Sequence, residues 1–267
     1  MGAVITRFAP SPSGYLHLGH AASAAKVFGF TQDNDGICLL RIEDIDTTRC
    51  KPEFEQAIYE DLAWLGFTWP NPVRRQTDHM PDYKNVIGAL RDKGLVYRCF
   101  KSRKELEAGG PHPIVDTGLE QDLIASGKAF AWRLSLERTH KHLGYIYDKL
   151  TFLDHGTEIR ARPALLGDVV LARKDIGTSY HVACCHDDAL QDVTDIVRGV
   201  DLLESTHIHR LLQELMNWPV PRYHHHALLV GADGKRYSKT DKSLAIRAMR
   251  QSGASPQNIL AQAKQLG

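Results

Sequence analysis

Two histidines near the start of the chain have the residue type and spacing to act on a phosphate group. His17 and His20 end the segment RFAPSPSGYLHLGH. The segment reads as the end of a short strand and a turn rich in proline and glycine, followed by an alanine-rich helix over 21–30. A helix that starts at such a turn points backbone N–H groups at an anion above the strand end. Residues three apart share one side of a helical turn, and Gly19 lets a ligand approach the backbone. The alternative is a surface turn with two incidental histidines, and the length of the motif argues against it.

A second cationic segment, GADGKRYSKT at 231–240, follows more than two hundred residues later. Its glycines and Asp233 predict a tight turn, which would carry Lys239 on a loop. The pair Ser238 and Lys239 alone would carry no information. Because the segment follows an apolar strand expected at 227–230, it supports a second phosphate-binding element.

An acidic cluster follows another expected strand. Residues 37–42 form an apolar run interrupted by one arginine, which is typical of a buried parallel strand. Glu43 comes directly after it, and side chains at this end of a strand lie at the ligand edge of an open α/β sheet. Glu43 could therefore hold an amino group. The alternative is that the acidic residues of 43–46 pair with neighbouring arginines in a solvated loop, which we expect for Asp46.

An arginine in the second half of the chain is a candidate for binding a carboxylate. Arg198 stands near the end of an apolar strand expected over 192–199. A helix is expected over 205–216, and Ser205 or Thr206 could cap it. An arginine at a strand end offers a carboxylate a bidentate partner that is always charged. An amide lacks the second anionic acceptor, so such a site would reject it.

These segments need a fold that brings distant strand ends to one edge. Apolar runs alternate with amphipathic helical patterns, which predicts an α/β protein with a doubly wound parallel sheet of the Rossmann type. Within the chain, 131–136 and 145–152 alternate apolar and polar residues, which predicts antiparallel strands of a mixed α/β insertion. A buried strand is expected next, at 167–172. We expect the first half of a nucleotide-binding fold at 1–100, the insertion (connective subdomain) at 101–165, the second half at 166–245 and a helical segment at 246–267.

The composition bounds the class of protein. The chain has 267 residues, of which 43% are hydrophobic and 24% charged, as in an ordinary soluble globular protein. The formal net charge is +1, so any RNA contact must come from a local patch. No run approaches the ~18 apolar residues of a transmembrane helix, and the start lacks the layout of a signal peptide. We therefore expect a cytoplasmic protein without a membrane partner.

The cysteines favour reduced thiols in a cytosol, because their number is odd and they lack framework spacing. They are Cys38, Cys50, Cys99, Cys184 and Cys185. No CxC or CxxC pair exists, and Cys99 with His112 cannot complete a tetrahedral site, so we predict no structural zinc. The histidines of 224–226 could bind a stray metal, but one inward and two surface side chains are the preferred interpretation.

Two stretches carry a resemblance to a known family. RFAPSPSGYLHLGH at 7–20, with LLRIEDIDTTR at 39–49, resembles the opening of glutamyl-tRNA synthetases, which are class I aminoacyl-tRNA synthetases with the HIGH signature. RYSKT at 236–240 is similar to their second signature, KMSKS, in which Ser238 and Lys239 match. The short chain resembles one branch in particular, the glutamyl-Q tRNA(Asp) synthetases, which correspond to the catalytic half alone.

The resemblance implies roles for residues of these motifs. The catalytic residues would be His17, His20 and Lys239, and the ATP-binding set would add Gly19 and Ser238. Glutamate would be bound by Arg7, Ala9, Ser11, Glu43, Tyr180 and Arg198, with Glu43 at its α-amine and the last two at its side chain. ATP is expected to bring Mg²⁺ held mainly by phosphates, so no metal-binding residues of the protein are expected.

Three residues depart from the family pattern. Cys184 stands where full-length glutamyl-tRNA synthetases commonly have an asparagine, so we expect glutamate to be bound somewhat differently there. Tyr237 is bulkier than the usual residue of the second signature. Lys101 stands where many members of the branch carry the second cysteine of a zinc motif.

The implied reaction has two steps. The α-carboxylate of L-glutamate attacks the α-phosphate of ATP, and preorganised donors stabilise the developing charge. This activation would need no tRNA. The glutamyl group then passes to a hydroxyl, which the resemblance places on queuosine at the first anticodon position of tRNA(Asp). The chain would act as a monomer without an anticodon-binding domain. The insertion would face the RNA, and its basic contact candidates are Lys101, Arg103, Lys104, Lys128, Arg133, Arg138 and Lys141.

Three alternatives stay open at this point. A truncated glutamyl-tRNA synthetase would charge a tRNA 3′ end instead. A small-molecule nucleotidyltransferase would share the HxGH turn and the sheet, although Tyr180 and Arg198 argue against it. An RNA-binding module without activity is the third, and the intact HLGH and SK motifs argue against it.

Overall fold

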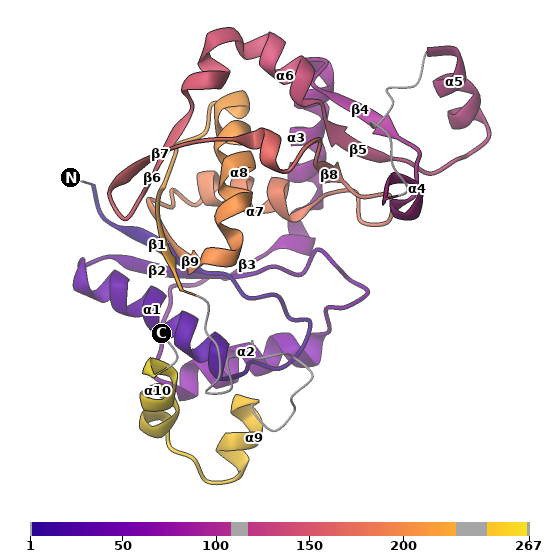
Figure 1. Ribbon diagram of the computed structural model, residues 1–267. Coiled ribbons are helices and arrows are strands. Elements are labelled where there is room, and N and C mark those ends of the chain that lie inside the picture. Colours follow the sequence, from indigo (N-terminus) through magenta and orange to yellow (C-terminus); the bar gives the residue numbers. More distant parts are fainter. Residues whose placement is uncertain (1, 108–116, 228–244, 266–267) are drawn as a thin grey trace.

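A parallel sheet forms the centre of the fold (Figure 1). The computed structural model describes residues 2–107, 117–227 and 245–265. In the first half of the chain, the apolar run of β2 (Ile37–Ile42) pairs in parallel with β1 (Ile5–Phe8) and with the short β3 (Arg74–Arg75). The strand predicted over 37–42 is confirmed.

The second half of the chain adds the other strands of the sheet. β10 (Arg222–His226) pairs in parallel with β9 (Asp195–Gly199) and β6 (Thr151–Asp154), and β7 (Thr157–Arg160) is an antiparallel edge. The backbone N–H of Thr194 donates to the carbonyl of Ile5 over 2.9 Å, which places β9 beside β1. The order is therefore β3-β2-β1-β9-β10-β6-β7. The chain adds strands first on one side of β1 and later on the other, so the strand order reverses between β1 and β9. Ligands bind at such a reversal in doubly wound folds. The predicted fold class is confirmed.

Helices cover both faces of this sheet, and each face has its own hydrophobic core (Figure 1). Ile196 of β9 belongs to one core and its neighbour Val197 to the other, as the alternation of a strand requires. The core of Ile196 is completed by α3 (Met80–Asp92), α7 (Tyr180–Leu190) and α8 (Leu203–Met216). The core of Val197 is completed by α1 (Leu18–Asp33), α2 (Pro52–Trp64), α9 (Ile246–Gln251) and α10 (Pro256–Lys264). In the ranges that the structure describes, no helix combines the length and the apolar character needed to cross a membrane.

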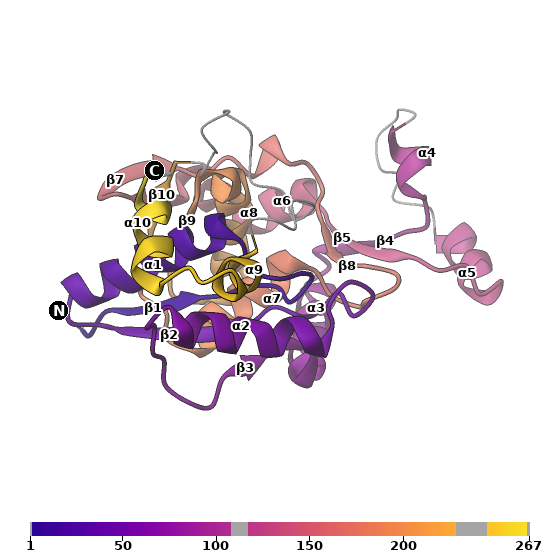
Figure 2. The ribbon, with the colours of Figure 1, turned by 90° about the horizontal axis from the view of Figure 1, so that it is seen from below.

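A second, antiparallel sheet combines the strand predicted at 131–136 with two strands from outside the predicted insertion. Its strands are β4 (Val96–Cys99), β5 (Ala131–Leu134) and β8 (Val170–Ala172), in the order β4-β5-β8. The strand expected at 167–172 is therefore present as β8, and its partner is β5. Two helices, α4 (Arg103–Glu107) and α5 (Thr117–Ala125), extend from this sheet as an arm that points away from the parallel sheet (Figure 2). The remaining elements are α6 (Leu136–Leu143) and short 3-10 turns at 76–79, 144–149, 163–165 and 200–202.

The strand predicted over 145–152, as an antiparallel strand of the insertion, is wrong in its first part, and the strand that follows joins the parallel sheet beside β10. Residues 144–149 form a 3-10 turn, and the strand begins only at Thr151. Tyr145 is exposed while Tyr147 packs against the core. The alternation therefore arises from a turn with one buried side and not from the pleat of a strand.

The strand expected at 227–230 falls almost wholly outside the residues that the structure describes, and Arg222–His226, with the histidine tract, form a strand that was not predicted. A second local prediction is wrong. Neither Ser205 nor Thr206 caps α8, because the helix begins at Leu203 after a 3-10 turn and Leu202 occupies the N-cap without a side-chain bond. The hydroxyl of Thr206 donates to the carbonyl of Leu202 inside the first turn.

Candidate functional site

The turn before α1 places His17 and His20 against each other at the carboxyl end of β1. His17 is the N-cap of α1, and its Nδ1 accepts a hydrogen bond from the backbone N–H of Gly19 over 3.2 Å. The backbone N–H of His17 donates to Nδ1 of His20 over 3.1 Å. The two rings stand 3.8 Å apart between centroids. The prediction that both histidines share one side of the first turn is confirmed.

These hydrogen bonds select the tautomer of each ring. An imidazole nitrogen that accepts a hydrogen bond carries no proton, so in the neutral form the proton lies on Nε2. Each histidine then presents Nε2–H as a donor. The first turn of α1 contains no acidic residue, so the helix start and the two imidazoles together favour an anion such as phosphate.

The chain returns to this turn near its end. Ala245 forms a β-bridge with His17, and the backbone N–H of Ile246 donates to the carbonyl of Leu16 over 2.9 Å. The segment 228–244 that precedes Ala245 lies outside the described residues, and with it the predicted Ser238 and Lys239. The described residues that follow this segment therefore lie beside the histidine turn.

Arg198, at the carboxyl end of β9, is buried among neutral partners. Its Nη1 donates to the hydroxyl of Tyr180 over 3.2 Å, and its Nε donates to Nε2 of His225 over 3.2 Å. Its Nη2 donates to the hydroxyl of Thr206 over 2.7 Å and to the carbonyl of Leu202 over 3.2 Å. Among the described residues, no carboxylate forms an ion pair with this guanidinium. A buried charge without a counter-charge is costly, so Arg198 is suited to receive a carboxylate from a ligand.

Three histidines near Arg198 stay neutral at pH 7. Burial, together with the charge of Arg198, lowers the pKa of His181 to about 4 and that of His225 to about 4. The same two causes lower the pKa of His209 well below its usual value. Nδ1 of His181 lies 3.1 Å from Nε2 of His209, whose Nδ1 lies 3.5 Å from Nη1 of Arg198. The positive charge of this cluster therefore resides on Arg198.

A cavity of about 540 Å³ opens beside Tyr180, and we call it the acceptor cavity. Three of the predicted glutamate-binding residues, Ser11, Glu43 and Tyr180, line it. Burial raises the pKa of Glu43, whose Oε1 lies 3.4 Å from Nη2 of Arg41. Burial also raises the pKa of Tyr180 well above its usual range, so its hydroxyl stays protonated. The cavity thus joins an acidic group, which suits an ammonium, to the tyrosine that contacts Arg198.

Arg7 is bound to a carboxylate of the protein itself. Its Nε donates to Oδ1 of Asp188 over 2.9 Å, and Nη2 of Arg41 donates to the same oxygen over 2.8 Å. Burial alone would raise the pKa of Asp188, but the charges of the two arginines lower it to about 2. The thiol of Cys184 donates to Oδ2 of Asp188 over 3.4 Å, and burial raises the pKa of Cys184 to about 12. Arg7 therefore differs from Arg198 in having a counter-charge, and the partly buried Ala9 follows it at the end of β1.

The acidic residues after β2 differ in burial and in partners. Asp44 is buried and accepts hydrogen bonds from the backbone N–H of Thr77 over 2.9 Å and from its hydroxyl over 2.5 Å. Asp46 instead lies 3.4 Å from Nη1 of Arg173 at the edge of the acceptor cavity. Asp46 is therefore paired, but with Arg173 from a distant segment and not with a neighbouring arginine, whereas Glu43 is the acidic residue that meets Arg41. The solvated-loop interpretation is wrong for the buried Asp44.

The zinc prediction stays a prediction. Cys99 is buried in β4, and His112 lies outside the described residues. Within the described ranges, no three side chains of histidine, cysteine, aspartate or glutamate gather as metal ligands. The tract 224–226 lies within β10, with His225 buried and its two neighbours partly exposed, as preferred from the sequence.

The polar network that holds Arg198 was not predicted. Thr206, His209 and Gln213 are all buried on α8. Their spacing of three and four residues repeats once per helical turn, so a polar stripe in an otherwise apolar helix was the available signal. His225 could have been recognised as inward-facing only after the histidine tract was assigned to a strand, where neighbours alternate.

Comparisons with known proteins show the family and the fold. The model of the family described as tRNA synthetases class I (E and Q), catalytic domain, matches residues 3–112 and 145–267. The glutamyl-Q tRNA(Asp) synthetase of Rhodobacter capsulatus is 42% identical to this chain, over 96% of this chain and 98% of that protein. Glutamate–tRNA ligase 2 of Gluconobacter oxydans is 35% identical over 98% of this chain and 60% of its own length.

Solved structures add a likeness in three dimensions. The crystal structure of the glutamate–tRNA synthetase from Elizabethkingia anophelis has a TM-score of 0.74 and 27% identity, and the match covers 95% of this chain and 54% of that one. The chain therefore spans nearly all of the Rhodobacter protein, 60% of the Gluconobacter ligase and about half of the Elizabethkingia synthetase.

Proposed function

This chain belongs to the family of class I tRNA synthetase (E and Q) catalytic domains, and we propose that it activates L-glutamate with ATP and transfers the glutamyl group to queuosine in tRNA(Asp). The observation that carries the amino-acid choice is the buried Arg198, which has only neutral described partners. A γ-carboxylate would supply the missing counter-charge. The γ-amide of glutamine would leave the guanidinium without it, which disfavours glutamine strongly.

ATP is proposed to lie at the start of α1, at the reversal of strand order between β1 and β9. The α-carboxylate oxygen of glutamate forms a bond to the α-phosphorus, the bond from this phosphorus to the bridging oxygen breaks, and pyrophosphate leaves. Nε2–H of His17 and of His20 would donate to phosphate oxygens as charge develops, without giving up their protons. The bridge between Ala245 and His17 supports a place for Lys239 at the same nucleotide.

Magnesium is proposed to enter with the nucleotide. The start of α1 offers nitrogen donors and no acidic side chain, which suits direct contact with phosphate oxygens. A Mg²⁺ ion held mainly by those phosphates would neutralise charge on the leaving pyrophosphate. No residue of the chain is assigned to it.

The α-amine and side chain of glutamate would lie on opposite sides of Tyr180. Glu43 in the acceptor cavity would hold the ammonium group. Arg198 behind Tyr180 would hold the γ-carboxylate. Ser11 lines the same cavity and would contact the substrate there, whereas Arg7 would act through Asp188 and the position of β1.

The acceptor is tested by comparing tRNA(Asp) with and without queuosine. We expect labelled glutamate to enter only the queuosine-containing tRNA, and removal of the 3′-terminal adenosine to leave this labelling unchanged. Equal labelling of both tRNAs, abolished by removal of that adenosine, would instead establish the second candidate, charging of a tRNA 3′ end. The similarity to the Gluconobacter ligase favours including that candidate.

A further inference from the structure

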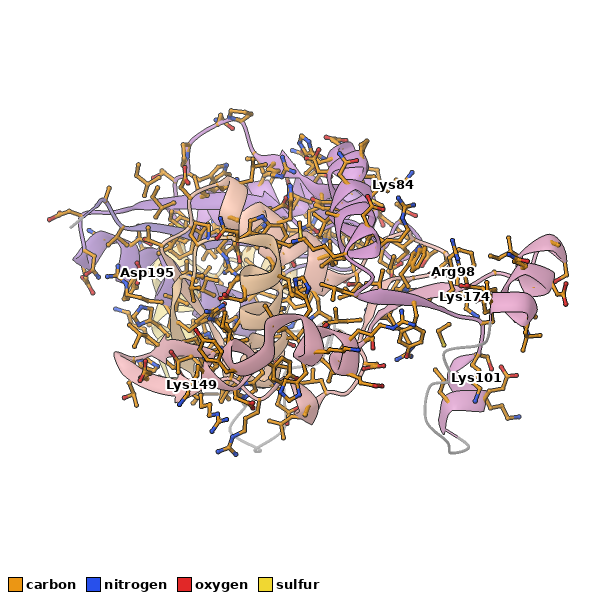
Figure 3. All side chains as sticks on the ribbon, turned by 90° about the horizontal axis from the view of Figure 1, so that it is seen from above. Lys84, Arg98, Lys101, Lys149, Lys174 and Asp195 are labelled. Atoms are coloured by element: carbon orange, nitrogen blue, oxygen red, sulfur yellow. The ribbon has the colours of Figure 1, made fainter. Side chains whose placement is uncertain are left out.

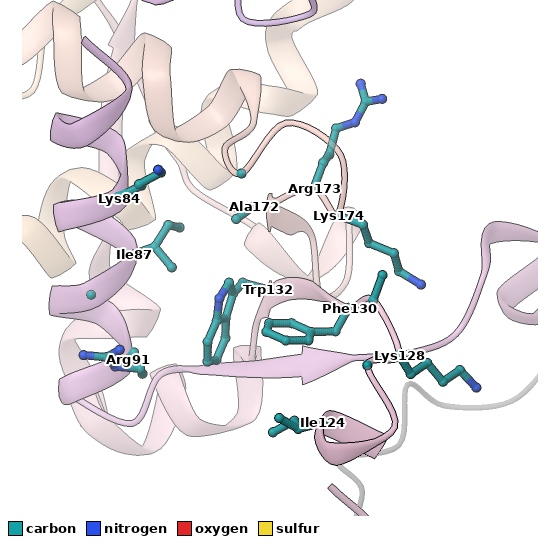
Figure 4. Close-up of a pocket in the computed structure, with 14 residues that line it drawn as sticks. Lys84, Ile87, Arg91, Ile124, Lys128, Phe130, Trp132, Ala172, Arg173 and Lys174 are labelled. Atoms are coloured by element: carbon teal, nitrogen blue, oxygen red, sulfur yellow. The ribbon is translucent and has the colours of Figure 1, made fainter. Parts of the chain in front are cut away.

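A second cavity, which we call the aromatic cavity, lies next to the acceptor cavity. It has a volume of about 520 Å³ and is bounded by α3, β5 and the segment after β8. Phe130 and Trp132 form one wall, and Lys84 and Ile87 extend from α3 on the opposite side (Figure 4). Neither the fold nor the proposed chemistry of glutamate uses this space.

The charged side chains that line this cavity are all cations, although Arg91 and Arg173 are paired with carboxylates outside the lining. The described lining residues include no carboxylate, and its cations are Lys84, Arg91, Lys128, Arg173 and Lys174. A concentration of five cations stands out in a chain whose formal net charge is +1. Among the described residues, neither Lys84 nor Lys128 forms an ion pair, and both are exposed. Such a surface attracts phosphate groups.

Arg98 packs against the aromatic wall from outside the aromatic cavity. The rings of Phe130 and Trp132 meet edge to face, with centroids 5.5 Å apart. The guanidinium carbon of Arg98 lies 4.6 Å from the centroid of Trp132, and these two residues also line a smaller cavity of about 230 Å³. Trp132 therefore stands between two cavities, with Arg98 in one and the cation-lined space in the other. A fixed indole beside cations is the arrangement on which an unstacked base is bound.

One residue connects this wall to the proposed chemistry. Arg173 lines both the aromatic cavity and the acceptor cavity, and it is positioned by Asp46 at 3.4 Å and Asp175 at 2.6 Å. If an RNA strand places its acceptor nucleoside in the acceptor cavity, its backbone would pass Arg173. The neighbouring nucleotide would then reach the aromatic cavity.

We propose that the aromatic cavity binds one unstacked nucleotide of the RNA substrate, with its base on Trp132 and Phe130 and its phosphate near Lys84 and Lys128. This proposal rests on the proposed function, because it takes the acceptor to be a nucleoside in a single-stranded loop. It assigns Trp132 and Lys84 to RNA positioning and leaves the activation of glutamate to other residues.

The experiment titrates the full chain into a fluorescent anticodon stem–loop of tRNA(Asp) that carries queuosine. Trp132→Leu should weaken binding on the order of 5- to 150-fold, the range expected for loss of one stacked base. Trp132→Phe should retain most of the affinity because phenylalanine still offers a ring. Lys84→Gln should weaken binding and lower the slope of log affinity against log salt concentration by about 0.7, the value for one phosphate of a single strand.

The matched control for the charge is Lys149→Gln. Lys149 is also an exposed lysine, but it lies well away from Lys84, on another part of the molecule (Figure 3). Its replacement should change neither affinity nor salt slope. Glutamate-dependent ATP–pyrophosphate exchange should stay within about twofold of the original in every variant, because none of these residues is assigned to activation.

The outcomes separate this proposal from the proposed function. Unchanged affinity of Trp132→Leu, or an unchanged salt slope of Lys84→Gln, overturns the RNA assignment of the aromatic cavity even if the original chain labels queuosine. If Trp132→Leu loses exchange and so fails to fold, the salt slope of Lys84→Gln decides alone. If the original chain labels no tRNA but the variants weaken stem–loop binding as expected, the cavity assignment stands and the proposed acceptor fails.

Discussion

At the scale of single residues, the backbone determines which ring nitrogen of His17 and of His20 can donate to a ligand. Nδ1 of His17 and Nδ1 of His20 each accept from a backbone N–H, so each ring acts through Nε2. His17 therefore has two separable roles, one in capping α1 and one in donating to a ligand. An asparagine can keep the first and lose the second, because asparagine is among the best N-cap residues.

We predict that His17→Asn and His17→Ala differ in stability but not in activity. Both should lower the rate of glutamate-dependent ATP–pyrophosphate exchange about 10²- to 10³-fold, the usual effect of removing one preorganised donor. Only His17→Ala should also lose about 1 kcal/mol of unfolding free energy, because it removes the cap. Exchange assays and urea unfolding of both variants measure this, and normal exchange in His17→Asn would remove the donor role.

Arg198→Lys should weaken the selection of glutamate. Lysine keeps the charge but has a single ammonium group, which cannot reach Tyr180, His225 and Thr206 together as the guanidinium does. We expect kcat/KM for glutamate in the exchange reaction to fall about 10- to 150-fold, the effect of one lost hydrogen bond to a charged group. The KM for ATP should not change. Arg222→Lys is the control, because Arg222 is an exposed arginine paired with Asp195 on the neighbouring strand, and equal losses in both variants would contradict the assignment.

At the scale of elements, a buried carboxyl lies where α2 faces α9. Asp61 of α2 is 2% exposed, and its Oδ2 lacks a hydrogen-bond partner among the described residues. Burial raises the pKa of Asp61 to about 6, although Arg250 and Arg247 oppose this shift. The folded state then holds the proton more tightly than the unfolded chain does. The stabilisation is complete below an ordinary aspartate pKa and is lost as the pH rises through about 6.

Asp61→Asn should therefore stabilise the protein in one pH range only. At pH 7.5 the free energy of unfolding should rise by about 1 to 2 kcal/mol, because the variant no longer has a buried ionised carboxylate. At pH 4 the variant and the original chain should be nearly equal. Urea unfolding at both pH values measures the difference. The opposite pattern, with a loss at pH 7.5, would mean that the two arginines stabilise the ionised form.

Elements whose own residues favour their structure were predictable, and those that depend on distant partners were not. β2 matches its predicted bounds because its run is apolar apart from Arg41 and most of it is buried inside the sheet. β10 (Arg222–His226) was not predicted, since RYHHH reads as polar on its own. Its histidines become strand residues because β9 and β6 pair with it, and because His224 and His225 meet Asp195 and Arg198.

The candidate site also has parts that the local sequence predicts and parts that depend on distant partners. The spacing of His17 and His20 and the position of Arg198 at a strand end could be read locally. The partners of Arg198 could not, because His209 and His225 come from α8 and β10, and the packing of three elements brings them together. The pairing of Arg7 with Asp188 crosses 181 residues and was equally out of reach.

At the scale of the whole molecule, the arm of α4 and α5 lies apart from the parallel sheet (Figure 2), so it could be removed without cutting into that sheet. Cys99 pairs with Ala131 at the end of the β4 and β5 ladder. The chain could therefore cross between Phe100 and Phe130, whose rings lie 5.5 Å apart, with a two-residue turn. The proposed division of the chain makes the arm part of an insertion that serves the RNA.

We predict that replacing 101–129 with Asn-Gly, a preferred two-residue hairpin turn, separates the two steps of the reaction. Exchange should stay within about twofold of the original, since the histidine turn and Arg198 keep their contacts. Glutamylation of tRNA(Asp) should fall at least about tenfold, because Lys101, Lys104 and Lys128 are removed. Loss of both activities together, in a protein that still unfolds cooperatively, would contradict the proposed division.

The neighbouring position of β1 and β9 has a consequence for how the protein is made. Ile5 leaves the ribosome 189 residues before Thr194, to which it is hydrogen-bonded. At ordinary elongation rates this interval is about 10 to 40 seconds, during which one edge of β1 has no partner strand. A nascent chain interrupted in this interval would carry the histidine turn without Arg198. The unpaired edge of its β1 strand would be a target for chaperones.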